Sequence, residues 1–204
     1  MPRLKDVRAF DGAENKIKRL GLGHVWNEVR AVLTGFHLEV EARFPANDAA
    51  VLVEVLNRRF AMTEGWARRK VGGRLWVKAL VVDGAQICVG VRLQVSGRRD
   101  VSGPDLMIVE VTTLAQVMIS GSVDVAILVV PSDELSAYLG RRSPKFSDAM
   151  RAAERSSFTD LPFMVVGLQP DTVRPVRPQG PAQPRGKPAN SYLTGTRVLS
   201  CAPV

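Results

Sequence analysis

The chain has 204 residues, of which 46% are hydrophobic and 24% charged, which fits one globular domain with a buried core and excludes a fibrous or wholly disordered protein. Its 28 lysines and arginines outnumber its 20 aspartates and glutamates, and the net charge of +8 favours a polyanionic partner. Two cysteines are too few for a disulfide framework, and no apolar run reaches the ~20 residues of a membrane span. We therefore expect a cytoplasmic protein that is not bound to a membrane.

The first clear pattern is a strand followed by a helix. Residues 36–44 alternate apolar and polar side chains, which predicts a half-buried strand ending before Pro45. Asn47 is a suitable N-cap for a helix over 48–64. In this segment apolar residues recur at helical spacing, namely Val51, Leu52, Val55 and Leu56.

Residues 81–97 predict a β-hairpin with Asp83 and Gly84 in its turn, because both residues tolerate a positive φ. The second strand is strongly apolar on one face, with Ile87, Val89, Val91, Leu93 and Val95. Its other face places Arg92 and Gln94 side by side. That face is either exposed to solvent or part of a site.

The next segments alternate between helix and strand. Pro104 suits the first turn of a buried helix over 102–121. Residues 123–131 form a nearly continuous apolar run, typical of a strand covered on both faces. An exposed helix over 145–157 and a second buried strand over 161–170 follow. Together, the predicted helices and strands indicate an α/β protein with a mixed sheet flanked by helices.

The composition changes near residue 170. Residues 170–204 are rich in proline and basic residues and poor in apolar ones, so they cannot bury enough surface to offset their ordering entropy. We therefore predict a folded domain over 1–169 and a flexible tail over 170–204. The basic residues of the tail either lie along a phosphate backbone or are simply solvated.

Several common chemistries are excluded by spacing. The glycines do not form a phosphate loop of the Walker or Rossmann type before a helix. His24 and His37 are the only histidines and there is no pair of neighbouring cysteines, so a zinc site would have to use scattered carboxylates. We expect both histidines to be structural.

Residues 75–167 resemble the BglII-like type II restriction endonucleases, members of the PD-(D/E)XK nuclease superfamily. The strand "VGVRLQ" is similar to the family's V-x-V-E-x-Q, and it is followed by a long helix, by "SVDVAILVVPSDEL" and by "LPFMVVGL". The preceding "LNRRFAMTEGW" is similar to the helix and Gly-Trp before the family's hairpin. The resemblance implies a restriction-endonuclease-like sheet, a homodimer, double-stranded DNA as partner, and Mg²⁺-dependent phosphodiester hydrolysis.

The resemblance also assigns catalytic positions. Asp83 corresponds to the aspartate that ligates the metal, Arg92 stands where the family has glutamate, and Gln94 matches the third position. Asp83 is either a metal ligand or only a turn residue. An arginine cannot ligate Mg²⁺, because it offers donors only. Arg92 can instead hold a phosphate directly, which would give binding without cutting, or it can pair with a nearby acid on the same sheet or face solvent.

Other acids are poor replacements for the missing glutamate. Asp105 and Glu110 lie five residues apart on the predicted helix, a spacing that puts them on different faces. Glu54 and Glu64, on and near the end of the earlier helix, are more plausible as auxiliary ligands or are simply solvated.

DNA contacts are expected in two basic segments. The loop after the 123–131 strand corresponds to the family's major-groove segment and carries Arg141, Arg142, Ser143 and Lys145. Arg68 and Arg69 either follow the DNA backbone or solubilise a helix end. Three functions remain open: an active endonuclease, a catalytically inactive DNA-binding relative, or a protein-interaction scaffold on the same fold.

Overall fold

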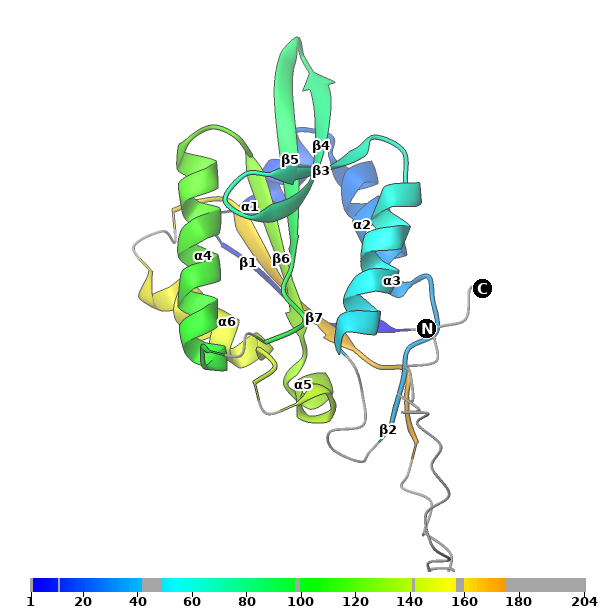
Figure 1. Ribbon diagram of the computed structural model, residues 1–204. Coiled ribbons are helices and arrows are strands. Elements are labelled where there is room, and N and C mark those ends of the chain that lie inside the picture. Colours follow the sequence, from blue (N-terminus) through cyan, green and yellow to red (C-terminus); the bar gives the residue numbers. More distant parts are fainter. Residues whose placement is uncertain are drawn as a thin grey trace, which may run out of the picture.

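A six-stranded mixed β-sheet divides the molecule into two layers of helices (Figure 1). The computed structural model describes residues 2–10, 12–41, 49–97, 100–140, 142–156 and 160–174. In order across the sheet the strands are β1 (Arg3–Ala9), β7 (Phe163–Gln169), β6 (Val125–Pro131), β5 (Ala85–Leu93), β4 (Arg74–Val82) and β3 (Trp66–Lys70). Strands β5, β6 and β7 are parallel, whereas β1, β4 and β3 pair antiparallel with their neighbours.

Helices cover both faces of the sheet. One layer contains α1 (Ala13–Arg19), α2 (Gly23–Thr34) and α3 (Ala49–Met62). The opposite layer contains α4 (Gly103–Ile119) and α6 (Phe146–Arg155), while the short α5 (Asp133–Leu139) follows β6. The predicted mixed α/β architecture is confirmed, and none of the described helices is long and apolar enough to cross a membrane.

Strand β6 shows how the sequence builds two cores. All seven of its residues are buried, as the continuous apolar run predicted. Val125, Ile127 and Val129 join the core under α2 and α3. Their neighbours Ala126, Leu128 and Val130 join the core under α4 and α6. The sheet therefore has no solvent-facing side at its centre.

The predicted hairpin is confirmed at its turn. Asp83 and Gly84 both have positive φ, and Val82 pairs with Ala85 across the turn. The first strand of the hairpin is longer than expected, because β4 begins at Arg74. The edge strand β3 was not predicted, since four of its five residues are exposed and show no apolar alternation.

The helix predicted over 102–121 is confirmed as α4. The Ser102 hydroxyl caps it by accepting a hydrogen bond from the Asp105 amide, and Pro104 occupies its first turn. Strand β7 and helix α6 are confirmed as well, but the prediction that α6 is exposed is wrong for one of its sides, where Ala149, Ala152 and Ala153 are buried. The prediction of a loop after β6 is partly wrong, because α5 begins there. The Ser132 hydroxyl caps this helix by accepting a hydrogen bond from the Leu135 amide.

The strand predicted over 36–44 is only partly within the described residues. Its buried alternation is correct at Phe36, Leu38 and Val40, but the described strand is the short β2 (Glu39–Glu41). It pairs in parallel with β8 (Thr172–Arg174). Residues 42–48, with the expected N-cap Asn47, lie outside the described part of the chain.

Strand β8 lies beyond the predicted domain boundary at residue 169. Asp171 links it to the segment before β2: its carboxylate accepts from the Leu38 amide at 2.9 Å and lies 2.9 Å from the His37 ring. The Asp171 amide donates to the Leu38 carbonyl. The folded part therefore includes residues 170–174, whereas 175–204, most of the predicted tail, lie outside the described residues.

Candidate functional site

A pocket of about 380 Å³ lies where β5 runs past the start of β4. It is bounded by α3, by the β3–β4 turn and by the segment that follows β5. The residues that line it are Val53, Asn57, Arg68, Gly73, Arg74, Trp76, Arg92, Leu93, Gln94, Ser96 and Gly97. The structure thus brings Arg68 together with Arg92 and Gln94, which the sequence had already placed side by side.

Two glycines shape the β3–β4 turn, and one of them, Gly73, lines the pocket. Gly72 and Gly73 both have positive φ, a conformation that glycine adopts without steric cost. A Cβ atom at Gly73 would overlap the Arg92 guanidinium, and one at Gly72 would overlap Val117 of α4. The turn can therefore lie directly on Arg92 and on α4.

Arg92 is buried between the sheet and α4. Its Nη2 atom lies 2.5 Å from Oε2 of Glu110, which is fully buried on α4. Its Nη1 atom donates to the Gly72 carbonyl at 3.1 Å and to that of Arg74 at 3.5 Å. Arg92 therefore pairs with an acid, which was one of the alternatives. The acid, however, lies on α4 and not on the same sheet. The strand face that carries Arg92 is covered, not solvated.

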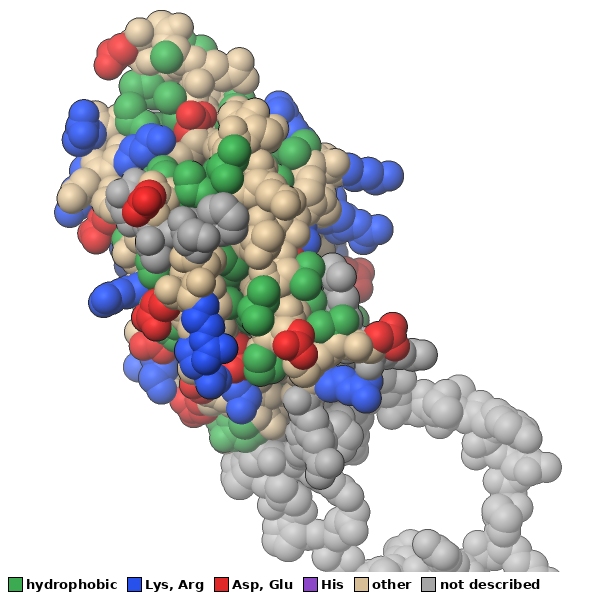
Figure 2. Space-filling view, turned by 90° about the vertical axis from the view of Figure 1, so that its left-hand side faces the viewer, with side chains coloured by type: hydrophobic (Ala, Val, Ile, Leu, Met, Phe, Trp, Pro, Cys, Tyr) green, Lys and Arg blue, Asp and Glu red, His purple; other side chains and the backbone are tan. Residues whose placement is uncertain are grey.

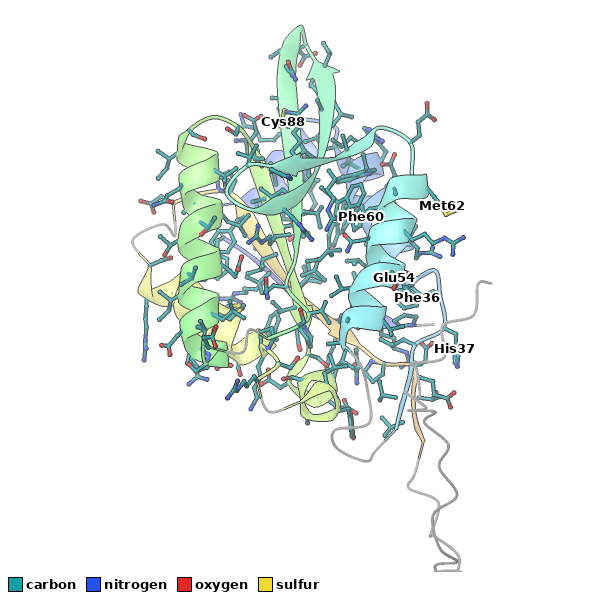
Figure 3. All side chains as sticks on the ribbon, viewed as in Figure 1. Phe36, His37, Glu54, Phe60, Met62 and Cys88 are labelled. Atoms are coloured by element: carbon teal, nitrogen blue, oxygen red, sulfur yellow. The ribbon has the colours of Figure 1, made fainter. Side chains whose placement is uncertain are left out.

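Two amide side chains border the pocket with part of their hydrogen-bonding capacity unused. Asn57 accepts from the indole Nε1 of Trp76 at 2.9 Å, and Gln94 donates to the Ser96 carbonyl at 2.7 Å. Trp76 also stacks on Phe60 at a centroid distance of 5.6 Å. Phe60 points from α3 towards the sheet, whereas Met62 points away (Figure 3). The aromatic pair holds the α3 side of the pocket in place.

The accessible charge of the pocket is positive. Arg68 and Arg74 are exposed, and within the described residues neither forms an ion pair. The Arg92 charge is compensated by Glu110. Because no carboxylate is among the described residues lining the pocket, it attracts anions.

The residues assigned to metal binding do not converge. Asp83 is exposed at the tip of the hairpin, before β5 begins, whereas Arg92 lies near the end of β5. Glu54, Glu64 and Asp105 are exposed, and none of them lines the pocket. In the described part of the chain, no three histidine, cysteine, aspartate or glutamate side chains lie close enough together to hold a metal ion.

Magnesium requires several oxygen ligands, usually including carboxylates. The pocket offers mainly guanidinium groups, with the oxygens of amides and of Ser96 beside them. This donor set does not fit Mg²⁺. Arg92 occupies the position that the resemblance assigns to a metal-ligating glutamate, and its guanidinium offers only donors.

The predicted DNA-reading loop lies beside the pocket. A Cβ atom at Gly97 would overlap the Arg142 carbonyl, so these two segments are in close contact. Ser143 is buried and donates its hydroxyl to the Val95 carbonyl at 2.9 Å, which ties the loop to the segment after β5. Lys145 is exposed at the start of α6, and Arg141 lies outside the described residues.

Other site residues lacked a usable sequence signal. Arg74 follows the glycine pair of the β3–β4 turn, which hinted at a close approach of the backbone but not at a site. Asn57 and Trp76 belong to a helix and a strand that their patterns describe only as amphipathic or apolar. Arg69 is exposed on β3, but it does not line the pocket.

A second polar cluster joins α2 to β3 and β4. Glu28 accepts hydrogen bonds from Trp66 Nε1 at 3.0 Å and from Lys78 Nζ at 2.7 Å. Burial raises the pKa of Glu28, but hydrogen bonds from Lys78 and Trp66 outweigh it, so this pKa lies below its ordinary value. The cluster holds the helix against the sheet beside the pocket's α3 wall.

Comparison with known proteins adds no assignment. The sequence matches no protein-family model, and no curated protein matches it.

Proposed function

We propose that this protein binds double-stranded DNA as a restriction-endonuclease-like protein and holds backbone phosphates at the basic pocket without cutting them. One observation carries the proposal: the described lining of the pocket contains three arginines and no carboxylate. Arginines bind phosphate through short, charge-assisted hydrogen bonds. Hydrolysis would additionally need a means of activating water, and the pocket residues do not provide one.

The order of elements supports the restriction-endonuclease-like fold as part of this proposal. Helix α3 precedes the β3–β4–β5 meander, α4 follows it, and β6 then lies parallel to β5. The pieces on which the resemblance rests therefore occur as helix, hairpin, long helix and buried strand. A likeness of fold does not by itself establish a function, so the proposal depends on the pocket.

Within this proposal the basic residues have different roles. Arg68 and Arg74 contact phosphate, because they are exposed and have no ion pair within the described chain. Arg92 is a positioning residue that fixes the β3–β4 turn through Gly72. Arg142 and Lys145 are on the surface, Arg142 next to the pocket residue Gly97, and both are suited to reading bases or contacting further phosphates.

A homodimer belongs to the same proposal. The outer face of α4 exposes Ile108, Val109 and Ile119, which are 47%, 47% and 64% exposed. Figure 2 shows this side of the molecule, with apolar side chains among polar ones. Burying such side chains against a second copy is favourable. We therefore assign α4 to the contact between protomers.

Binding of a blunt DNA duplex at low salt tests the proposal. We expect fluorescence anisotropy to show at least a tenfold loss of affinity for the double variant Arg68→Ala, Arg74→Ala. The plot of the logarithm of the binding constant against the logarithm of the salt concentration should become shallower, with its negative slope smaller in magnitude by about 2, because two phosphate contacts are lost. The control variant Arg30→Ala, Arg155→Ala removes the same charge from exposed positions outside the pocket and should bind much more tightly than the pocket variant.

The same samples also test whether DNA is cut. Incubation with Mg²⁺ or Mn²⁺ should give retarded complexes on a gel and no fragments. Discrete fragments would show that the protein is an active endonuclease. A failure to bind duplex DNA at low salt would overturn the proposed function.

A further inference from the structure

The unused groups of Asn57 and Gln94 are complementary. Asn57 uses its carbonyl oxygen to accept from Trp76, so its two N–H donors remain. Gln94 uses its amide nitrogen to donate to Ser96, so its oxygen remains as an acceptor. Within the described residues these remaining groups have no partner. The pocket therefore offers a donor and an acceptor from two different elements.

An apolar wall lies beside these amides. Val53 of α3, Trp76 of β4 and Leu93 of β5 line the same pocket. Val53 and Leu93 are half-buried, so they keep apolar surface open to a ligand. An apolar wall next to a few directional polar groups is the usual composition of a small-molecule site.

The size of the pocket exceeds what a backbone phosphate requires. Its volume of about 380 Å³ falls in the range of roughly 300–1,000 Å³ that is common for small-molecule sites. A phosphate within a duplex needs only surface donors, which Arg68 and Arg74 already supply. The concave part of the pocket, with its amides and apolar wall, is left without a role by duplex binding alone.

We propose that the pocket accepts one unpaired nucleotide, with its base between the apolar wall and the amides of Asn57 and Gln94 and its phosphate on Arg68 and Arg74. Every nucleobase has donors or acceptors on its pairing edge, and these groups are available only when the base is unpaired. The site thus distinguishes unpaired from paired nucleotides and has little preference among bases. This inference rests on the proposed DNA binding and names the part of the DNA that enters the pocket.

The unpaired nucleotide can come from a strand end, from a base displaced out of a duplex, or from free nucleotide. Four probes at one salt concentration separate these sources: a blunt duplex, the same duplex with a central one-nucleotide bulge, the same duplex with a short single-stranded overhang, and deoxyadenosine monophosphate. We expect at least fivefold tighter binding of the bulged or the overhanging duplex than of the blunt one. Binding should also quench tryptophan fluorescence, and the quenching should be weaker in Trp76→Phe.

A matched pair of variants assigns this preference to the pocket. Gln94→Leu removes the unused acceptor at nearly constant volume and should bring the ratio of bulged to blunt affinity close to one. Gln86→Leu makes the same change on β5, at an exposed position outside the pocket, and it should leave the ratio unchanged. The thermal unfolding midpoint of each variant shows whether it is folded.

The outcomes separate this inference from the proposed function. Equal binding of blunt, bulged and overhanging duplexes would overturn the inference while leaving duplex binding intact. Binding of the unpaired probes alone would support the inference and overturn the duplex-binding proposal. If none of the probes binds, both are wrong.

Discussion

At the scale of single residues, the Arg92–Glu110 ion pair joins the sheet to α4. Both side chains are buried, and their atoms approach to 2.5 Å. Removing two charges from water costs several kcal/mol, and their attraction offsets this cost only while both are present. The pair therefore makes the docking of α4 sensitive to the loss of either partner.

A double-mutant cycle measures this coupling. We expect Glu110→Leu and Arg92→Met each to lower the free energy of unfolding by about 3–5 kcal/mol, because each leaves the other charge buried without its ion-pair partner. The double variant Arg92→Met, Glu110→Leu should lose much less than the sum of the single losses. Urea unfolding at equilibrium gives each value. Additive losses would contradict the coupling.

Glu28 gives the fold an acid-sensitive contact. Its pKa lies below the ordinary value of 4.5, so its ionised form stabilises the folded state at neutral pH. This stabilisation is lost as the pH falls from about 4.5 through the lower pKa of the folded state. Glu28→Gln should therefore cost about 1 kcal/mol or less at pH 7, as expected for a partly exposed pair, and progressively less in acid.

Unfolding in urea across this pH range checks the prediction. The difference between the wild type and Glu28→Gln should shrink below pH 4.5, and Lys78→Met should show the same trend because it removes the partner. A difference that stays constant from neutral to acidic pH would mean that Glu28 carries no acid-sensitive stability.

At the scale of elements, the β3–β4 turn shapes the pocket through its glycines. Gly73 and Gly84 both have positive φ, at 107° and 80°, so alanine is strained at either position. Only at Gly73 would the added Cβ overlap Arg92, whereas at Gly84 it meets nothing within 4 Å. Gly73→Ala should therefore destabilise the protein by about 1–3 kcal/mol more than Gly84→Ala. Thermal unfolding measures both, and equal losses would show that the turn moves freely away from Arg92.

The elements that the sequence predicted well have strong local signals. The hairpin turn at Asp83 and the buried strand β6 follow from turn chemistry and from an unbroken apolar run. Strand β3 is almost entirely exposed, and α5 has only seven residues, so neither forms a long apolar pattern. Elements of this kind are determined by their neighbours in the fold.

The candidate site, like the fold, was predictable from the sequence only where a signal within one segment was enough. Alternation along the predicted strand placed Arg92 and Gln94 on one face, and both line the pocket, although β5 ends at Leu93 and Gln94 follows it. The apolar periodicity of α4 indicates a buried helix, but it does not show that Glu110 is fully buried or that it meets Arg92. The contribution of Asn57 depends on how α3 lies against β4, which a pattern within one segment does not contain.

At the scale of the whole molecule, segments distant in sequence close the fold. Strand β1 pairs with β7, and β2 pairs with β8. The resemblance covers residues 75–167 and includes none of β1, β2 or β8. The predicted boundary at residue 169 leaves out β8 and Asp171, which bonds to Leu38.

Two truncated chains test this boundary. A chain ending at residue 169 should be less stable than one ending at residue 174, because only the longer chain keeps β8 and the Asp171 contacts with His37 and Leu38. Both chains lack residues 175–204, so their comparison isolates five residues. Equal unfolding midpoints would place the boundary at 169.

The position of β3 at the edge of the sheet has a consequence for solubility. An edge strand presents backbone N–H and C=O groups to which a strand of another molecule can be added. Arg68, Arg69 and Lys70 are exposed on β3, so two copies brought edge to edge would repel each other. These basic side chains, including Arg68, which we assign to phosphate contact, therefore also protect the sheet from intermolecular strand addition. On the proposed function, DNA would neutralise these charges, and the bound duplex itself would then have to keep other strands away from this edge.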